Sequence, residues 1–117
     1  MPSPRRVEKL SNLIREELAV YLAREIEFPD SMLVTITRVT VSPDAHYASA
    51  MISVLPSHAE KSALEILAKN IYHIQQAVNR RMRTRPVPKI TFRIDEGEER
   101  REHVEQSLAQ LKQKDEV

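Results

Sequence analysis

The residues best suited to chemistry in this sequence are basic side chains that no acidic residue interrupts. Between Glu65 and Asp95 there is no aspartate or glutamate, whereas seven lysines and arginines fall in that interval. They are Lys69, Arg80, Arg81, Arg83, Arg85, Lys89 and Arg93. Because the formal net charge of the whole chain is only +1, this separation of charge predicts a surface that faces a polyanion. The alternative is an ordinary solvated helix face, although such faces usually mix the two signs.

The composition excludes several classes of site. The chain has no cysteine, which removes disulfides, thiolate metal sites and cysteine nucleophiles together. Its one glycine is Gly97, so a Walker loop, a dinucleotide fingerprint and a GxxG phosphate clamp are absent. His58 and Glu60 match half of a deaminase zinc motif, but the other half needs cysteines. We therefore expect no enzymatic activity, no metal or other cofactor, and no small-molecule substrate.

Length and patterning predict a soluble cytoplasmic protein with one core. A chain of 117 residues fits a single domain. The N-terminal residues lead into an amphipathic run rather than a continuous apolar segment, which argues against a signal peptide. No apolar stretch approaches the ~18 residues needed to cross a bilayer. Because the apolar stripes are used by one core, we expect a monomer that does not bind membranes.

The elements that must position the basic residues begin with a long amphipathic helix. Ser3 suits its N-cap and Pro4 its first turn. Pro29 should stop the helix, because a residue before proline, here Phe28, is disfavoured in helical space. Apolar residues recur at intervals of three and four, at Val7, Leu10, Ile14, Leu18, Tyr21 and Leu22.

Two strands joined by a tight turn should follow this helix. The segment Leu33–Val41 is rich in Val, Ile and Thr, but its alternation slips, which predicts a β-bulge near Thr37 and Arg38. Residues 42–45 have proline where a type I turn favours it. In the second strand, 46–55, the alternate residues that should face the core are Ala48, Ala50, Ile52 and Val54.

Two central helices should come next. Ser57 and Glu60 form a capping box for the first of them, which should run to about Lys69. A short linker, 68–70, leads to a second helix that extends from residue 71 to about Thr84, before Pro86. The second helix should bury Ile71, Ile74, Val78 and Met82.

A third strand, Lys89–Ile94, completes the predicted domain. Ile90, Phe92 and Ile94 should be buried, and Lys89, Thr91 and Arg93 should point outward. The order helix, strand, strand, helix, helix, strand is that of an α+β, type II KH-like domain, in which helices pack on one face of a three-stranded sheet. We expect this domain to span 1–96. Residues 97–117 should form an acidic C-terminal helix or tail, since 95–117 carries eight acids against four bases.

These elements divide the basic residues. On the second central helix, Arg80 and Arg83 lie opposite the buried stripe, whereas Arg81 borders it and should run along the core edge with only its head exposed. With no tryptophan and few exposed aromatic residues, contact with the shape and phosphates of folded RNA is favoured over base-by-base reading. The predicted RNA-binding residues are Lys69, Asn70, Tyr72, Gln76, Arg80, Arg81, Arg83, Arg85, Lys89 and Arg93.

Several short blocks carry a family resemblance. The most specific is Thr37-Arg38-Val39 with Val41-Ser42-Pro43-Asp44; others are Ile14-Arg15-Glu16-Glu17-Leu18, Arg80-Arg81-Met82-Arg83 and Val87-Pro88. Over about residues 5–96 the chain resembles the ribosome-binding factor A family of bacteria and organelles. The resemblance implies a non-catalytic assembly factor that binds the free small (30S) ribosomal subunit through its 16S rRNA. It also implies help in late maturation and rRNA processing, often in adaptation to cold.

One position departs from the family pattern. The family joins its central helices by Ala-x-Gly, and this chain has Ala68-Lys69-Asn70. Asparagine tolerates a left-handed backbone better than most residues. We therefore expect Asn70 to be left-handed and the kink between the helices to be kept.

Two other functions fit parts of the sequence. The paired central helices suggest a DNA-binding helix-turn-helix regulator, although the arginines gather at the C-terminal end of the second helix, whereas recognition helices read bases with N-terminal residues. The acidic terminal helix suggests a protein–protein adaptor instead. Binding to duplex DNA tests the first function, and deletion of residues 97–117 tests the second.

Overall fold

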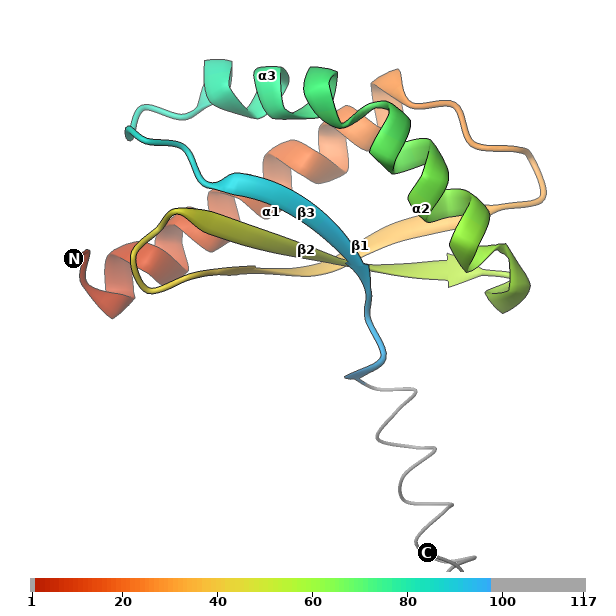
Figure 1. Cartoon of the computed structure of the whole chain (residues 1–117), viewed down its shortest axis with the longest axis horizontal. Coiled ribbons are helices and arrows are strands. Elements are labelled where there is room, and N and C mark those ends of the chain that lie inside the picture. Colours follow the sequence, from red (N-terminus) through yellow and green to blue (C-terminus); the bar gives the residue numbers. More distant parts are fainter. Residues whose placement is uncertain (1, 98–117) are drawn as a thin grey trace, which may run out of the picture.

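In residues 2–97, which the computed structural model describes, a three-stranded sheet carries three α-helices on one of its faces (Figure 1). The elements are α1 (Pro4–Glu25), β1 (Leu33–Val41), β2 (Tyr47–Leu55), α2 (Glu60–Lys69), α3 (Ile71–Arg81) and β3 (Lys89–Ile94), with a 3-10 turn at Ser57–Ala59. This is the predicted α+β, type II KH-like order. Beyond Gly97, the expected acidic C-terminal helix lies outside the described residues.

The sheet is mixed and has the strand order β1-β2-β3. β2 pairs antiparallel with β1 and parallel with β3. α1 packs on β1 and α3, and α2 packs on β2 and β3. The centre of the core is the inner face of β2, where Ala48, Ala50, Ile52 and Val54 are at most 3% exposed, as their alternation predicts.

α1 begins where the sequence predicts and ends earlier. The backbone N–H of Arg6 donates to Ser3 Oγ at 3.2 Å, which confirms the N-cap. The helix ends at Glu25 and does not continue to Phe28 as predicted. Ile26 is the reason, because it leaves the helix in an extended conformation (φ −105°, ψ 123°) and is buried in the core.

The predicted bulge in β1 is present, and it reorients an arginine. Ile36 pairs with Ile52 and Arg38 with Met51, so that Thr37 is the extra residue. An extra residue shifts the alternation of side chains along the strand. Ile36 therefore faces the core, while Arg38 faces away from the helices.

The capping box predicted at Ser57 and Glu60 does not form. α2 begins at Glu60 after the 3-10 turn, and no side-chain hydrogen bond caps either element. The Glu60 N–H, which a capping box would direct to the Ser57 hydroxyl, bonds to the Ser57 backbone carbonyl instead. The turn thus satisfies this donor before the side chain can.

Candidate nucleic-acid interface

α3 presents a polar face to solvent because its apolar residues pack inward. Ile74 and Val78 are buried against the core. On the other side Tyr72 is 67% exposed, Arg80 is exposed and Gln76 is half-buried. The predicted position of Arg80, opposite the buried stripe, is confirmed, whereas the role of the three residues in RNA binding stays a prediction.

Positive charge gathers where α3 ends. Arg80 and Arg81 occupy its last turn, where the helix dipole stabilises cations. The helix stops at Arg81, earlier than the predicted end at Thr84. It stops there because Met82, whose N–H still donates to the Val78 carbonyl, is extended (φ −88°, ψ 137°) and buried.

Arg81 does not run along the core edge as predicted. Its side chain is 70% exposed, and its Nε lies 3.9 Å from Oε2 of Glu17 on α1. α1 therefore offers a carboxylate where the prediction placed apolar surface. An exposed ion pair contributes little to stability, and it leaves the guanidinium accessible.

The loop between α3 and β3 holds two more arginines, Arg83 and Arg85, both exposed. Nη1 of Arg85 donates to the carbonyl oxygens of Met82 at 2.7 Å and Thr84 at 2.9 Å. Because a guanidinium has five N–H donors, three remain for other partners. We name Arg80, Arg81, Arg83 and Arg85 the α3–loop surface.

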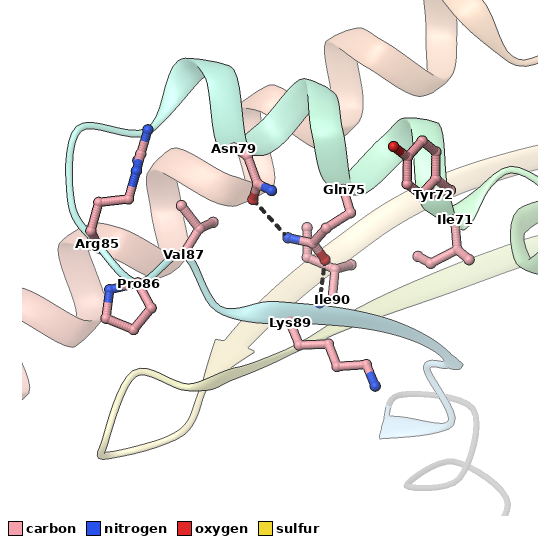
Figure 2. A pocket seen from close by; sticks show the side chains of 9 residues that line it. All are labelled: Ile71, Tyr72, Gln75, Asn79, Arg85, Pro86, Val87, Lys89 and Ile90. Atoms are coloured by element: carbon pink, nitrogen blue, oxygen red, sulfur yellow. Dashed lines mark hydrogen bonds between the residues drawn. The ribbon is translucent and has the colours of Figure 1, made fainter.

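A groove of about 640 Å³ lies between α3, this loop and the start of β3 (Figure 2). Gln75 spans it. Its Nε2 donates to Asn79 Oδ1 at 3.0 Å and to the Pro88 carbonyl at 3.1 Å, and its Oε1 accepts the Ile90 N–H at 2.9 Å. Gln75 is not among the residues that the sequence pattern singles out. One general rule could have pointed to it. The backbone N–H groups of an edge strand need acceptors, and a polar side chain on a neighbouring helix can supply one.

A larger groove of about 970 Å³ lies between α1 and the loop. Arg6 and Lys9 of α1 line it together with Arg83 and Arg85. Sequence pattern alone does not connect these pairs, because they are far apart in the chain and meet only through packing of α1. The groove is not uniformly basic, since its lining also includes Glu16, Glu17 and Asp44.

The junction of α2 and α3 places Lys69 and Asn70 at the other end of α3 from Arg80. Asn70 has φ −103° and ψ 4°, so the prediction of a left-handed residue is wrong. Its backbone N–H bonds to the carbonyls of Ile66 and Leu67, and its side-chain Nδ2 donates to the Ile66 carbonyl at 2.8 Å. These bonds complete the end of α2 without a left-handed turn.

Arg93 lies apart from the α3–loop surface, whereas Lys89 lines the same groove as Arg85. β3 exposes both cations and buries Ile90, as predicted, whereas Phe92 and Ile94 are only half-buried. Because the helices pack on the face to which Ile90 points, Lys89 and Arg93 are on the opposite, open face of the sheet; Figure 2 shows Lys89 directed away from α3. The ten predicted residues therefore extend from the helix side of the sheet to its open face, and Lys89 lies at the edge between the two.

Two aspartates beside the strands are held in their ionised form. A hydrogen bond from the Thr37 hydroxyl, then one from the Gly97 N–H, lowers the pKa of Asp95, and Arg38 adds a smaller effect. The pKa of Asp44 is lowered by the Ser42 hydroxyl and by the His46 N–H.

Within residues 2–97 there is no group of three or more acidic or histidine side chains that could hold a metal ion. In the same part of the chain no helix is both long and apolar enough to cross a membrane.

Comparison with known proteins gives one consistent match. A family model described as ribosome-binding factor A matches residues 6–108. The protein of that name from Thermomicrobium roseum is 34% identical over 114 residues, covering 97% of this chain and 88% of the relative. The one from Acetivibrio thermocellus is 35% identical over 97 residues, covering 81% of this chain and 79% of the relative.

Solved structures agree in fold. The crystal structure of ribosome-binding factor A from Thermus thermophilus has a TM-score of 0.69 at 24% identity and covers 78% of this chain and 97% of the other. A model of the Thermus thermophilus factor fitted into a cryo-EM map of its complex with the 30S subunit has a TM-score of 0.64 at 25% identity. It covers 74% of this chain and 92% of the other.

Proposed function

The chain belongs to the ribosome-binding factor A family, and we propose that it binds the small (30S) ribosomal subunit through 16S rRNA as a non-catalytic factor in late subunit maturation. It acts in the cytoplasm, as a monomer, without a cofactor. The relative from Thermus thermophilus is described in a complex with the 30S subunit. A factor of this kind needs a surface that complements a polyanion.

The observation that carries this proposal is the α3–loop surface. Four arginines project there from one helix end and one loop, and the carboxylate of Glu17 lies beside one of them, 3.9 Å from Arg81. Arginine is suited to phosphate because its planar donors match the phosphate oxygens. Rigid attachment of the loop through Gln75 and Arg85 keeps these donors in place before RNA arrives.

The experiment is co-sedimentation with separated ribosomal subunits, using the double variant Arg80→Glu with Arg83→Glu. We expect a melting temperature close to that of the wild type, because both side chains are exposed. Binding to the small subunit should fall by about a hundredfold or more, because two phosphate contacts become two repulsions. The control is Arg15→Glu with Lys61→Glu, which makes the same change of charge at exposed positions of α1 and α2.

If the double variant sediments with small subunits as well as the control does, the α3–loop surface is only a solvated face. Titration with salt gives an independent reading: neutralisation of four to six phosphates predicts a slope of log affinity against log salt of roughly −3 to −5. A slope near zero contradicts the electrostatic argument. Preference for duplex DNA over subunits would favour the helix-turn-helix alternative.

A further inference from the structure

The face of the sheet opposite the helices carries cations and hydroxyl groups, has an exposed leucine pair at one end, and contains no acidic strand residue. β1, β2 and β3 include Arg38, Lys89 and Arg93 but neither aspartate nor glutamate. The side chains that point away from the core on β2 are one aromatic, one methionine, two serines and a leucine, at alternate positions 47–55. The outward residues of the neighbouring strands are threonines, the three cations and Leu33, which pairs with Leu55.

The register of the sheet puts the two arginines in one row and the lysine beside an aromatic residue in another. Arg38 pairs with Met51 and Met51 with Arg93, which puts two arginines in one row across the three strands. Tyr47, which is 60% exposed, pairs with Lys89 at the other end of β3. Between these rows lie the hydroxyls of Thr40, Ser49 and Thr91.

The bulge in β1 is what adds Arg38 to this face. Its guanidinium Nε lies 3.8 Å from Asp95 Oδ2, and its side chain is 61% exposed. Asp95 also accepts hydrogen bonds from the Thr37 hydroxyl and the Gly97 N–H. The carboxylate is therefore shared among several partners, and Arg38 keeps donors for a second anion.

We propose that the open face of the sheet is a second RNA-binding surface, on which Arg38, Lys89 and Arg93 bind phosphates of a strand that stacks a base on Tyr47. This proposal rests on the proposed function, and it extends it: the open face lies on the side of the sheet away from the helices, and its Lys89 also lines the groove beside Arg85 at the edge of β3. One molecule therefore contacts two rRNA segments. Charge complementarity supports RNA as the occupant. Cations, hydroxyl donors and one exposed aromatic are what a nucleic-acid strand binds.

The first test uses the absence of cysteine from the chain, which makes an introduced cysteine unique. Full-length variants Thr91→Cys on the open face, Thr84→Cys in the loop and Ser62→Cys on α2 are each labelled with a short photo-crosslinker and bound to small subunits; all three positions are exposed. We expect Thr91→Cys and Thr84→Cys to crosslink to different rRNA positions and Ser62→Cys to give no rRNA product.

The outcomes separate the two proposals. If Thr84→Cys crosslinks to rRNA and Thr91→Cys does not, the sheet-face inference fails while the proposed function stands. If no variant crosslinks and none sediments with small subunits, the proposed function fails. If Thr91→Cys crosslinks to a ribosomal protein or to a second copy of this chain, the open face has a protein partner and the inference is overturned.

A second test measures the same contacts without a label. Arg38→Gln with Arg93→Gln should lower the magnitude of the salt slope for rRNA binding by about 2, one for each lost phosphate contact. The matched control, Arg15→Gln with Lys61→Gln, removes the same charge and should leave the slope unchanged. An equal slope in both double variants overturns the inference, provided that thermal melts show both to be folded.

Discussion

The side-chain oxygen of Gln75 accepts the backbone N–H of Ile90 at 2.9 Å, and the same side chain donates to the Pro88 carbonyl at 3.1 Å. One residue of α3 therefore fixes both the end of the loop and the first buried residue of β3. The loop carries Arg83 and Arg85, so the geometry of the proposed RNA surface depends on a residue with no charge of its own.

Gln75→Ala should destabilise the fold by about 1–3 kcal/mol, because it leaves the Ile90 N–H and the Pro88 carbonyl without this partner. Its neighbour Gln76 is the matched control, and Gln76→Ala should change stability by about 0.5 kcal/mol or less. Urea unfolding of both variants measures the difference. Equal stabilities would mean that the Gln75 bonds are replaced by water at no cost.

Asn70→Ala should cost about 0.5–1.5 kcal/mol, because the hydrogen bond from Nδ2 to the Ile66 carbonyl is lost. Asn70→Gly should give no stabilisation, since φ of −103° needs no glycine. Thermal unfolding distinguishes this from a left-handed junction. A glycine variant more stable than the wild type would contradict the observed backbone conformation.

Ala45 has φ of 61° in the hairpin turn, and its N–H donates to the Ser42 carbonyl at 2.8 Å. A left-handed alanine is strained because its Cβ approaches the following carbonyl. Ala45→Gly should therefore stabilise the protein by up to about 1 kcal/mol, after the entropy cost of glycine in the unfolded chain is subtracted. Ala23→Gly, at an exposed site within α1, should destabilise by a similar amount.

Asp95 predicts a dependence of stability on acid. Its pKa in the folded protein is lowered, first by the Thr37 hydroxyl and then by the Gly97 N–H, from an ordinary value of 3.8. The contribution of the carboxylate is fully present above that value and is lost as the pH falls through the lower folded pKa. The difference in unfolding free energy between wild type and Asp95→Asn should therefore shrink as the pH falls from neutral to below 3.8.

Thr37→Val is the second mutation of a double-mutant cycle that measures the coupling between Thr37 and Asp95. It removes the largest cause of the lowered pKa, so Asp95→Asn should have less effect in that background. Equal effects of Asp95→Asn with and without Thr37 would show that the hydroxyl does not stabilise the carboxylate.

Local periodicity was enough to predict most elements and one irregularity. The slip in alternation around Thr37 predicted the bulge, and alternation in β3 placed Lys89 and Arg93 outward, because both follow from side-chain geometry within one strand. The exposed positions of Tyr72 and Arg80 follow in the same way from the period of α3.

The errors have non-local causes. Glu17 of α1 lies beside Arg81 where apolar surface was expected, and no helical wheel of α3 contains that information. Arg6 reaches the groove beside Arg83 only through the packing of α1. The Ser57 capping box failed for a different reason, since a competing backbone hydrogen bond in the 3-10 turn satisfies the same donor.

The order in which the strands pair has a consequence for synthesis of the chain. The β1–β2 hairpin closes between neighbours such as Val41 and Ala48, whereas β3 joins through pairs such as Ala48 and Ile90, 42 residues apart (90 minus 48). Long-range pairing forms late, since a large loop must close first. A nascent chain can therefore complete the hairpin while the arginine loop is still unanchored, and we expect it to gain RNA affinity only once β3 has docked.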